Sequence, residues 1–292
     1  MTFATKRKIL NVTRYITLGF VSVIMLYPLL WMIAAIWRSN VAIWTEPGLI
    51  PSSPVSGWDN IVYGWTVGGR SLLFYFGNTL RFLIPRVIGQ VISCVLTAYA
   101  ITRFHFKGKK IVFSLVIITL LMPEVIFRIP MFHLFQYLRL FGPDAILFGG
   151  FAPLWLENWF ATGSFFVFML VQFMRTIPKD LDEAAKIDGC NSFQTLIFVL
   201  LPVMKPAIIT VGLLTFMWGM NDFLGPLIYL RPPEHRVLQQ ALRMATDPTG
   251  EAALNWGGIF AMSVMALLPA IIVFFSAQRY FIDGIASTGS KE

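Results

Sequence analysis

Charged side chains are scarce in this chain of 292 residues: only 13% are Asp, Glu, Lys or Arg, whereas 57% of the residues are hydrophobic. Water-soluble domains usually carry about 25% charged and about 45–50% apolar residues. So little charge cannot cover the surface of a soluble enzyme, and so apolar a chain is neither disordered nor fibrous. The composition therefore predicts an all-α polytopic membrane protein in contact with lipid.

Motifs that bind nucleotides or metals, or that hydrolyse bonds, are also missing. The chain has only two cysteines and three scattered histidines, which excludes a disulfide framework and a metal site of ordinary spacing. It has no G-x4-GK[ST] phosphate loop, no HExxH and no GxSxG. We expect no catalytic residue, no bound metal and no cofactor in this chain. We attribute its net charge of +8 to membrane topology and not to nucleic acid, because the basic residues cluster between apolar runs.

Six apolar runs approach the length of about 20 residues that a helix needs to cross the hydrocarbon layer. They lie at residues 16–37, 74–101, 111–127, 145–174, 207–230 and 257–281. The first is too long for the core of a signal peptide, so we expect an uncleaved anchor. In the fourth, Glu157 and Asn158 separate a short piece, which we expect at the outer interface, from a spanning piece at 159–174. No internal repeat is evident, which favours a half-transporter that needs a partner chain.

Positive charge predicts the orientation of these spans, because cytosolic loops carry an excess of Lys and Arg. With the N-terminus in the cytosol, 14 of the 23 basic residues fall on the cytosolic side and seven on the outer side. Both termini are then cytosolic, and 39–73 is an ordered outer loop. The cytosolic set is Lys6, Arg7, Lys8, Arg14, Arg103, Lys107, Lys109, Lys110, Arg175, Lys179, Lys186, Lys205, Arg279 and Lys291.

The cytosolic segment between the fourth and fifth runs predicts a short helix that ends in a tight turn. Pro178 suits the first turn of a helix, as do the acidic residues at 180, 182 and 183. Gly189 stands where a left-handed residue commonly ends a helix. The small residues Ala184 and Ala185 would let another protein surface approach the backbone closely.

A second helix follows this turn. Asn191 or Ser192 can cap it, and we expect Pro202 to stop it. On physical grounds alone, two interpretations of the whole segment are equally good. It is either a docking element for another protein or an amphipathic connector that lies on lipid headgroups.

Ionisable side chains also occur inside the apolar runs, where they are costly and usually functional. A rise of about 1.5 Å per residue places them in the middle or outer half of the membrane. They are Arg81, Arg86, Glu124 and Asp222, with Arg128 at similar depth and with Tyr229 on the helix expected for Asp222. Two interpretations stay open: ion pairs that lock helices or an outer gate, or a substrate pathway. The pathway would be lined by Asn78, Arg81, Glu124, Trp218, Asn221 and Asp222.

One family resemblance rests on the segment at 178–206. Glu183-Ala184-Ala185, Gly189 and Leu201-Pro202 match the spacing EAA-x3-G-x9-[hydrophobic]-x-LP, with Val199 where Ile is usual. The segment resembles the coupling segment of ABC-importer permeases, which docks into a cleft on the ATP-hydrolysing subunit. The resemblance implies that the docking contact is made by Glu183, Ala184, Ala185, Asp188 and Gly189.

Further motifs, in order from about residue 15 to 290, resemble the carbohydrate-uptake branch of that family, which includes the smaller permease of maltose transporters. Met220 in place of the usual Trp and extra residues at 154–162 are departures that bear on substrate choice, and Cys190 in place of Ala is a third. The matching motifs are Asn78-Thr79-Leu80, Ala98-Tyr99-Ala100, Arg103-Phe104, Asn221-Asp222-Phe223 and Gln278–Phe281.

The resemblance implies a type I ABC-importer permease fold in the bacterial cytoplasmic (inner) membrane, with six transmembrane helices and both termini cytosolic. A single permease domain at 16–286 would lie between a cytosolic segment at 1–15 and a cytosolic tail at 287–292. The implied partners are a second, different permease subunit, an ATPase dimer that holds ATP and Mg, and an extracytoplasmic solute-binding protein. The implied substrate is a sugar or oligosaccharide, with glycerol phosphate or a polyol as the alternative. The alternative from another class is a self-sufficient ion-coupled secondary transporter or channel, driven through Glu124 and Asp222.

Overall fold

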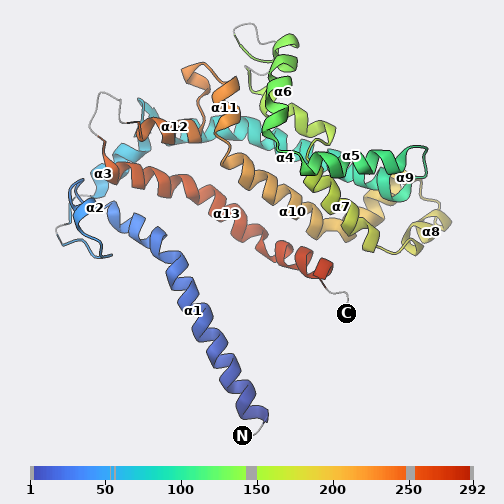
Figure 1. Cartoon of the computed structure of the whole chain (residues 1–292), viewed down its shortest axis with the longest axis horizontal. Coiled ribbons are helices and arrows are strands. Elements are labelled where there is room, and N and C mark those ends of the chain that lie inside the picture. Colours follow the sequence, from blue (N-terminus) through green and yellow to red (C-terminus); the bar gives the residue numbers. More distant parts are fainter. Residues whose placement is uncertain (1–2, 53, 56, 143–149, 248–253, 290–292) are drawn as a thin grey trace. The chain divides into compact units, whose positions relative to one another are not determined.

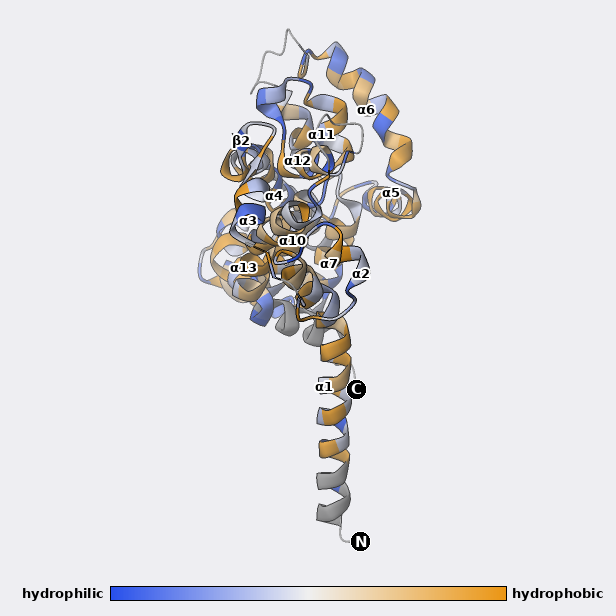
Figure 2. Ribbon diagram, turned by 90° about the vertical axis from the view of Figure 1, so that its left-hand side faces the viewer, coloured by the Kyte–Doolittle hydropathy of each residue, from blue (hydrophilic) through white to orange (hydrophobic). Residues whose placement is uncertain are grey.

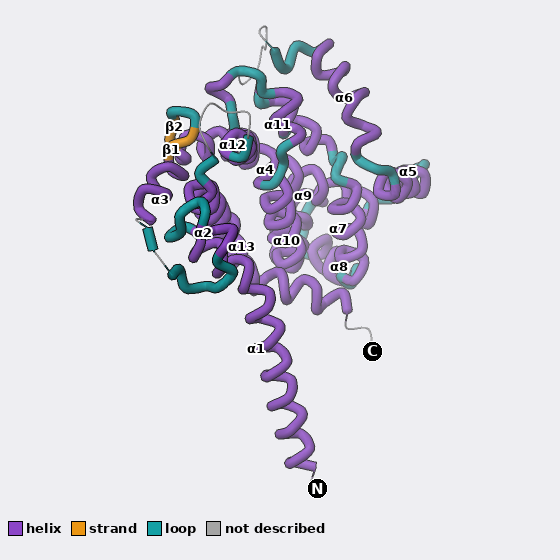
Figure 3. The backbone as a smooth tube through the Cα atoms, turned by 60° about the vertical axis from the view of Figure 1, so that its left-hand side comes forward, coloured by secondary structure: helices purple, strands orange, loops and turns teal. Residues whose placement is uncertain are grey.

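Helices make up nearly all of the structure, a computed structural model that describes residues 3–52, 54–55, 57–142, 150–247 and 254–289 (Figures 1 and 3). The α-helices are α1 (Phe3–Ala35), α2 (Ala42–Thr45), α3 (Gly57–Trp65), α4 (Leu72–Arg103), α5 (Lys109–Leu121), α6 (Val125–Tyr137), α7 (Ser164–Thr176), α8 (Asp180–Ile187), α9 (Ser192–Gln194), α10 (Leu201–Met220), α11 (Leu224–Tyr229), α12 (Leu238–Ala245) and α13 (Trp256–Gly289). A π-helix, η4 (Thr195–Leu200), joins α9 to α10. The 3₁₀ helices that lie wholly within the described residues are η2 (Ala152–Leu154), η3 (Leu156–Phe160) and η5 (Pro233–His235), and a hairpin pairs β1 (Thr66–Val67) with β2 (Arg70–Ser71). The chain divides into two units, residues 1–72 with 241–267 and residues 73–240 with 268–292.

Four of the described helices are long and apolar enough to cross a membrane: Leu10–Ala35, Leu72–Arg103, Ser192–Met220 and Trp256–Arg279. Two bent pairs pass the same test when each pair is taken together, Lys109–Leu121 with Val125–Tyr137 and Leu156–Thr176 with Asp180–Ile187. The described residues therefore hold four to six candidate spans. Hydrophobic residues predominate along α1 and α5 (Figure 2).

The third apolar run is interrupted where the sequence predicted one helix at 111–127. Helix α5 ends at Leu121, and α6 begins at Val125 after a bend of 108° between the two helices. Met122 at the break has extended backbone angles, with φ −81° and ψ 136°. The residue before a proline is biased away from the helical region, so Pro123 explains the interruption.

The fifth run differs from its prediction at both ends. The helix does not stop at Pro202 but continues from Ser192 to Met220. Pro202 has no N–H to donate and its ring crowds the preceding turn, and the wider π-helical turn η4, in which the Leu201 N–H donates to the Leu196 carbonyl, accommodates it. At the other end, α10 stops at Met220 and α11 starts at Leu224, so the run expected at 207–230 is two helices.

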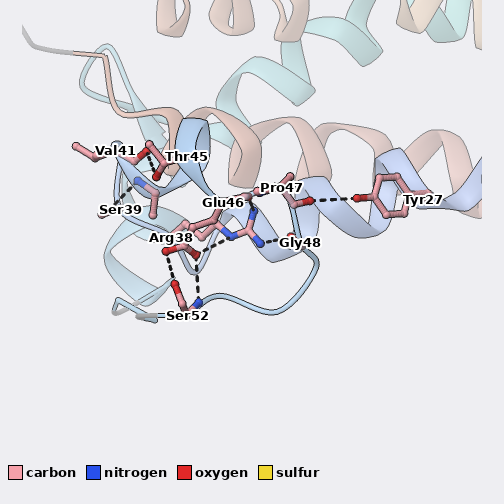
Figure 4. A network of polar contacts seen from close by, with 10 residues as sticks. Tyr27, Arg38, Ser39, Val41, Thr45, Glu46, Pro47, Gly48 and Ser52 are labelled. Carbon is pink, nitrogen blue, oxygen red and sulfur yellow. Dashed lines mark hydrogen bonds and ion pairs between the residues drawn. The ribbon is translucent and has the colours of Figure 1, made fainter.

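In the first unit, Arg38 organises the loop that follows α1 (Figure 4). This side chain is only 1% exposed, lies over the Trp31 ring at 5.8 Å and donates from Nη1 to the Glu46 carbonyl at 2.8 Å. It also donates from Nη2 to the Gly48 carbonyl. A buried guanidinium needs such acceptors to offset its lost hydration, so Arg38 fixes the path of residues 46–48.

The same loop is closed by Glu46, whose carboxylate accepts hydrogen bonds from the Ser52 hydroxyl and the Ser52 N–H (Figure 4). These bonds, with a smaller contribution from the charge of Arg38, hold the pKa of Glu46 below its ordinary value of 4.5. The Tyr27 hydroxyl of α1 donates to the Pro47 carbonyl at 3.1 Å. These hydrogen bonds hold residues 46–52 in place within the segment 39–73, which was expected to be an ordered loop.

Close helix packing completes the first unit. A Cβ on Gly64 of α3 would lie 2.6 Å from the Gly258 carbonyl oxygen, so only glycine permits this approach to α13. The buried Asn60 of α3 donates to the Ile36 carbonyl at 2.7 Å. Helix α3 is therefore fixed to the first turns of α13 and to the chain that follows α1.

The second unit has its hydrophobic core where α4, α7 and η4–α10 meet. Its most completely buried members are Cys94 and Ala98 of α4, Val167, Leu170, Val171 and Met174 of α7, and Leu200, Met204 and Val211 of η4 and α10. This core sets the position of both ends of α8, because α7 leads into α8 and α9–η4 leads out of it. Where these helices lie in lipid, their association is stabilised by van der Waals packing and interhelical hydrogen bonds, because lipid tails are as apolar as the core itself.

Candidate functional site

A helix, a glycine turn and a second helix occupy residues 180–200, as the sequence predicted. Helix α8 has Asp180, Asp182 and Glu183 in its first turn, where the helix dipole favours negative charge. Gly189 has φ +83°, the left-handed conformation that favours glycine. Asn191 caps the second helix in a capping box with Gln194, with both hydrogen bonds 2.9 Å long.

The residues implied in docking do not all face the same way. Glu183, Ala184, Asp188 and Gly189 are exposed, whereas Ala185 is only 4% exposed. Helix α8 packs against η4 of its own chain, and Ala185 lies on that side. Four of the five residues are thus available to a partner, while Ala185 attaches the helix to its own unit.

Two polar contacts tie this element to the end of α4. The Arg103 Nε and an Asp182 Oδ form an ion pair of 3.0 Å with side chains 8% and 14% exposed, and Arg103 also donates to the Ile177 carbonyl at 3.0 Å. The Tyr99 hydroxyl donates to the Ser192 carbonyl at 2.8 Å. Sequence reasoning used Arg103 for membrane topology and as part of a family motif, and it did not predict these contacts. The sequence signal that could have predicted this ion pair is an arginine at the end of one span together with an acidic residue in the first turn of a loop helix.

A second site is formed by charges from four elements of the same unit. Arg86 of α4 donates from Nη1 to Asp222 Oδ2 at 2.9 Å, with side chains 17% and 15% exposed. The other Asp222 oxygen accepts the Gly225 N–H at 3.0 Å. This local bond competes with continued helix and explains why α10 stops and α11 begins here.

Glu124 is placed differently from the expected position inside a helix. It precedes α6, its side chain is 78% exposed, and it forms a 3.2 Å ion pair with Arg128 in the first turn of α6. Glu157 of η3, which sequence reasoning used only to divide the fourth run, is half-buried and interacts electrostatically with Arg86, Asp222, Glu124 and Arg128. The structure thus brings three carboxylates and two guanidinium groups into one region.

The remaining pathway residues lie in three different surroundings. Asn78 is 2% exposed and donates to the Glu234 and Arg236 carbonyls at 2.8 and 2.9 Å, and its side-chain oxygen accepts from Arg81 at 3.2 Å. Asn78 thus holds the segment after α11, and Arg81 supports Asn78. Trp218 is 52% exposed with its ring 5.0 Å from that of Phe166.

Asn221 is exposed and donates to the Met217 carbonyl at 2.8 Å. It therefore sits at the C-terminal end of α10, one residue before Asp222. Of the six residues expected to line a pathway, four are exposed, Asp222 is partly exposed and Asn78 has almost no free surface. The exposed four are Arg81, Glu124, Trp218 and Asn221.

Comparison with known proteins gives one family and a consistent set of relatives. Residues 89–287 match the family described as binding-protein-dependent transport system inner membrane component. The arabinooligosaccharides transport system permease protein of Halalkalibacterium halodurans is 31% identical over 281 residues, which cover 94% of this chain and 95% of the relative. The galactooligosaccharides transport system permease protein of Bacillus subtilis is 28% identical, with 95% and 94% covered. The sn-glycerol-3-phosphate transport system permease protein of Rhizobium meliloti is 29% identical, with 97% and 98% covered.

The fold also matches a solved structure. One chain in the crystal structure of a bacterial ABC transporter involved in the import of the acidic polysaccharide alginate superposes with a TM-score of 0.76 and 22% identity. The match covers 96% of this chain and 99% of that chain. At this identity the match shows a shared fold.

Proposed function

Because this chain belongs to the family of inner-membrane components of binding-protein-dependent transport systems, we propose that it is the permease subunit of an ATP-driven importer of a sugar or oligosaccharide. An extracytoplasmic binding protein delivers that substrate. The oligosaccharide permeases among its relatives support the substrate class, since they cover nearly the full length of the chain. The family supports this function over that of a self-sufficient secondary transporter.

The observation that carries the proposal is the exposed turn between α8 and α9. Glu183, Ala184, Asp188 and Gly189 are free on its surface, while Ala185 and the Arg103–Asp182 ion pair fix it to the transmembrane core. A rigidly attached element with a free surface can transmit force from a partner to the helices. We assign this surface to an ATPase subunit, which binds ATP and Mg, and we assign a second, different permease to the other half of the pathway.

The proposed mechanism is a switch between two states. ATP closes the ATPase dimer, which draws the two coupling helices together and turns the membrane cavity from inward- to outward-facing. In this chain the ion pair at Arg103 passes the movement of α8 to α4, and η4–α10 passes it along the fifth run. The permease domain is taken as residues 16–286, with 1–15 and 287–292 in the cytosol.

The pathway residues stay a proposal within this function. Trp218 and Asn221 offer an aromatic ring and an amide on exposed surface beside Asp222, which suits contact with a polar sugar face. Glycerol phosphate is the second candidate substrate, since a full-length relative in Rhizobium meliloti transports it. Competition of labelled oligosaccharide uptake by glycerol phosphate separates the two.

The experiment that tests the proposal is purification of the tagged chain in mild detergent, with mass spectrometry of the proteins that accompany it. We expect a stoichiometric ATPase and a second multispan chain. With Gly189→Val, recovery of the ATPase should fall about tenfold or more, because a β-branched residue at φ +83° costs about 1–3 kcal/mol and displaces the turn. The second permease should be retained.

Gly108→Val is the matched control. Gly108 has φ +88°, and a Cβ at either glycine meets no atom within 4 Å, so the two substitutions impose the same backbone strain. Gly108→Val should keep the ATPase. Purification of the wild-type chain alone, or as a homo-oligomer, would overturn the proposed function.

A further inference from the structure

A cavity of about 380 Å³ opens where the α4–α5 and α7–α8 connections meet. It is lined by the last residues of α4, the first residue of α5 and the chain from Arg175 to Lys179. Neither the ion-pair region around Asp222 nor the exposed turn at Gly189 contributes to its lining. The cavity shares Arg103 and Ile177 with the contacts that attach α8, and it lies outside the docking turn and the Asp222 region.

The lining of this cavity is strongly basic. Four of its residues are cations, Arg103, Lys109, Arg175 and Lys179, and no Asp or Glu lines it. Arg103 is paired with Asp182. Among the described residues, no carboxylate lies within 4.0 Å of the charged nitrogens of the other three cations. Three positive charges beside one hollow favour an anion.

Two of these cations are held in position without a counter-ion. Lys109 donates from Nζ to the Phe104 carbonyl at 3.0 Å. The Arg175 guanidinium lies 4.6 Å from the centroid of the Phe113 ring. Both groups keep further N–H donors free, because an ammonium has three and a guanidinium five. The site is thus arranged to receive acceptor oxygens at little cost in side-chain entropy.

The start of α5 adds to this preference. Its 13 residues begin with Lys109 and Lys110, with no acidic residue in the first turn and no side-chain cap on its N–H groups. Lysine at a helix N-terminus opposes the helix dipole, and a bound anion offsets that repulsion. The helix dipole and the lysines therefore favour the same anionic ligand.

Apolar surface is exposed along the flank of α5 beside the cavity. Lys109 shares one face of the helix with Phe113, which packs against the core of the second unit. Ile117 and Leu121 lie on the adjoining flank and are 36% and 78% exposed. No residue of α5 is buried among the other described elements. A ligand with a phosphate at the basic cavity and hydrocarbon chains along this flank satisfies both surfaces.

We propose that this cavity binds the phosphate headgroup of an anionic phospholipid, with the acyl chains along α5. Basic pockets between spans on the cytosolic side are a recognised mode of binding for such headgroups. That the lipid comes from the cytosolic leaflet rests on the orientation in the proposed function; the binding itself does not. Free phosphate shares the headgroup chemistry but leaves the apolar flank of α5 uncovered.

Native mass spectrometry of the delipidated, purified full-length chain with whatever subunits accompany it tests the site. Phosphatidylglycerol should bind at least tenfold more tightly than phosphatidylcholine. Lys109→Gln with Arg175→Gln should weaken phosphatidylglycerol about 25-fold, since each basic residue near a lipid surface contributes about fivefold. Lys179→Gln, at an exposed lining residue whose loss leaves the core intact, should weaken it about fivefold.

The matched control is Lys107→Gln with Lys186→Gln, which removes the same charge at exposed positions outside the cavity. It should change phosphatidylglycerol binding by less than about twofold. An equal loss in the control pair would mean general electrostatic attraction and would overturn the site. Binding of inorganic phosphate as tight as that of phosphatidylglycerol would overturn the lipid in favour of the free ion. The measurement reads lipid on this chain whether or not an ATPase accompanies it, so it can fail independently of the proposed function.

Discussion

Asp222 shows how much of one residue's role is settled by the atoms around it. One carboxylate oxygen accepts the Arg86 guanidinium and the other accepts the Gly225 N–H, so both are used within the protein. Glu124 has an ion pair too, but with Arg128 of the helix that it precedes, and most of its side chain is exposed. The sequence left two interpretations open for these charges, an ion pair that locks helices and a substrate pathway, and the surroundings of Asp222 favour the ion pair. Most of the Glu124 side chain is exposed and can contact other groups.

Substitution of Asp222 by Asn separates a lock from a pathway. Asn keeps an acceptor for Gly225 but leaves the largely buried Arg86 without its counter-charge, so we expect a loss of about 1–3 kcal/mol in stability. The measurement is the melting temperature of the purified chain in detergent. Glu124→Gln is the matched control and should lose no more than about 0.5 kcal/mol, because exposed pairs within one helix contribute little. An unchanged melting temperature for Asp222→Asn, together with altered uptake, would instead indicate the pathway.

At the scale of elements, α8 works through its attachment as much as through its exposed surface. It has eight residues, which is too short for a stable helix by itself. The Arg103–Asp182 pair, the buried Ala185 and the core beneath η4 hold it against the second unit. A partner that moves α8 therefore moves α4 and α10 with it.

The Arg103–Asp182 ion pair is the tether between α8 and α4, and its loss should uncouple the ATPase from the membrane spans. We expect Asp182→Asn to lower uptake into proteoliposomes on the order of tenfold. The reason is that a loss of about 1.4 kcal/mol shifts the equilibrium between attached and detached α8 tenfold towards the detached form. The ATPase should still copurify, since the exposed surface at Glu183 and Gly189 is unchanged. The reversed pair, Arg103→Asp with Asp182→Arg, should restore part of the uptake.

Asp180→Asn provides the comparison for this tether. Asp180 lies in the same first turn and is exposed, with no ion pair at 4.0 Å or less among the described residues. It should keep uptake within about twofold of wild type. If both variants lose uptake equally, the effect belongs to the charge of α8 and not to the tether.

For the whole molecule, the central question is which side of the membrane each end of the spans faces. The described residues hold four to six candidate spans. The apolar runs predict six, and the distribution of Lys and Arg predicts that both termini are in the cytosol. In that orientation the loop at Ile50 is outside and the turn at Ile187 is inside. Both side chains are 87% exposed, which makes them equivalent sites for labelling.

Single cysteines at these positions test the orientation in a chain from which Cys94 and Cys190 have been removed. Ile50→Cys should react with an impermeant maleimide in intact cells. Ile187→Cys should react only after the membrane is permeabilised, with labelling in denaturant as the reference for total cysteine. Reaction of Ile187→Cys from outside would reverse the topology and place the docking surface on the wrong side for an ATPase.

Local sequence patterns were sufficient to predict several features of this protein. The scarcity of charge and the apolar runs predicted a helical membrane protein, and the EAA spacing with Gly189 indicated the family that the comparisons show. The helix–glycine–helix element was predicted correctly because dipole, cap and left-handed glycine act within a few residues. The stop at Pro202 was wrong because a proline can be accommodated by a wider helical turn, which hydropathy does not reveal.

Only the tertiary structure decided which charges meet. Arg86 and Asp222 are 136 residues apart in the chain, and Arg103 and Asp182 come from different helices, so no local pattern joins them. The breaks at Pro123 and Asp222 moved Glu124 and Tyr229 away from the helices expected for them. A sequence determines which side of its own helix a residue occupies, because that depends on a fixed rotation per residue. Its partner depends on how distant helices pack, and that packing is settled by the whole core at once.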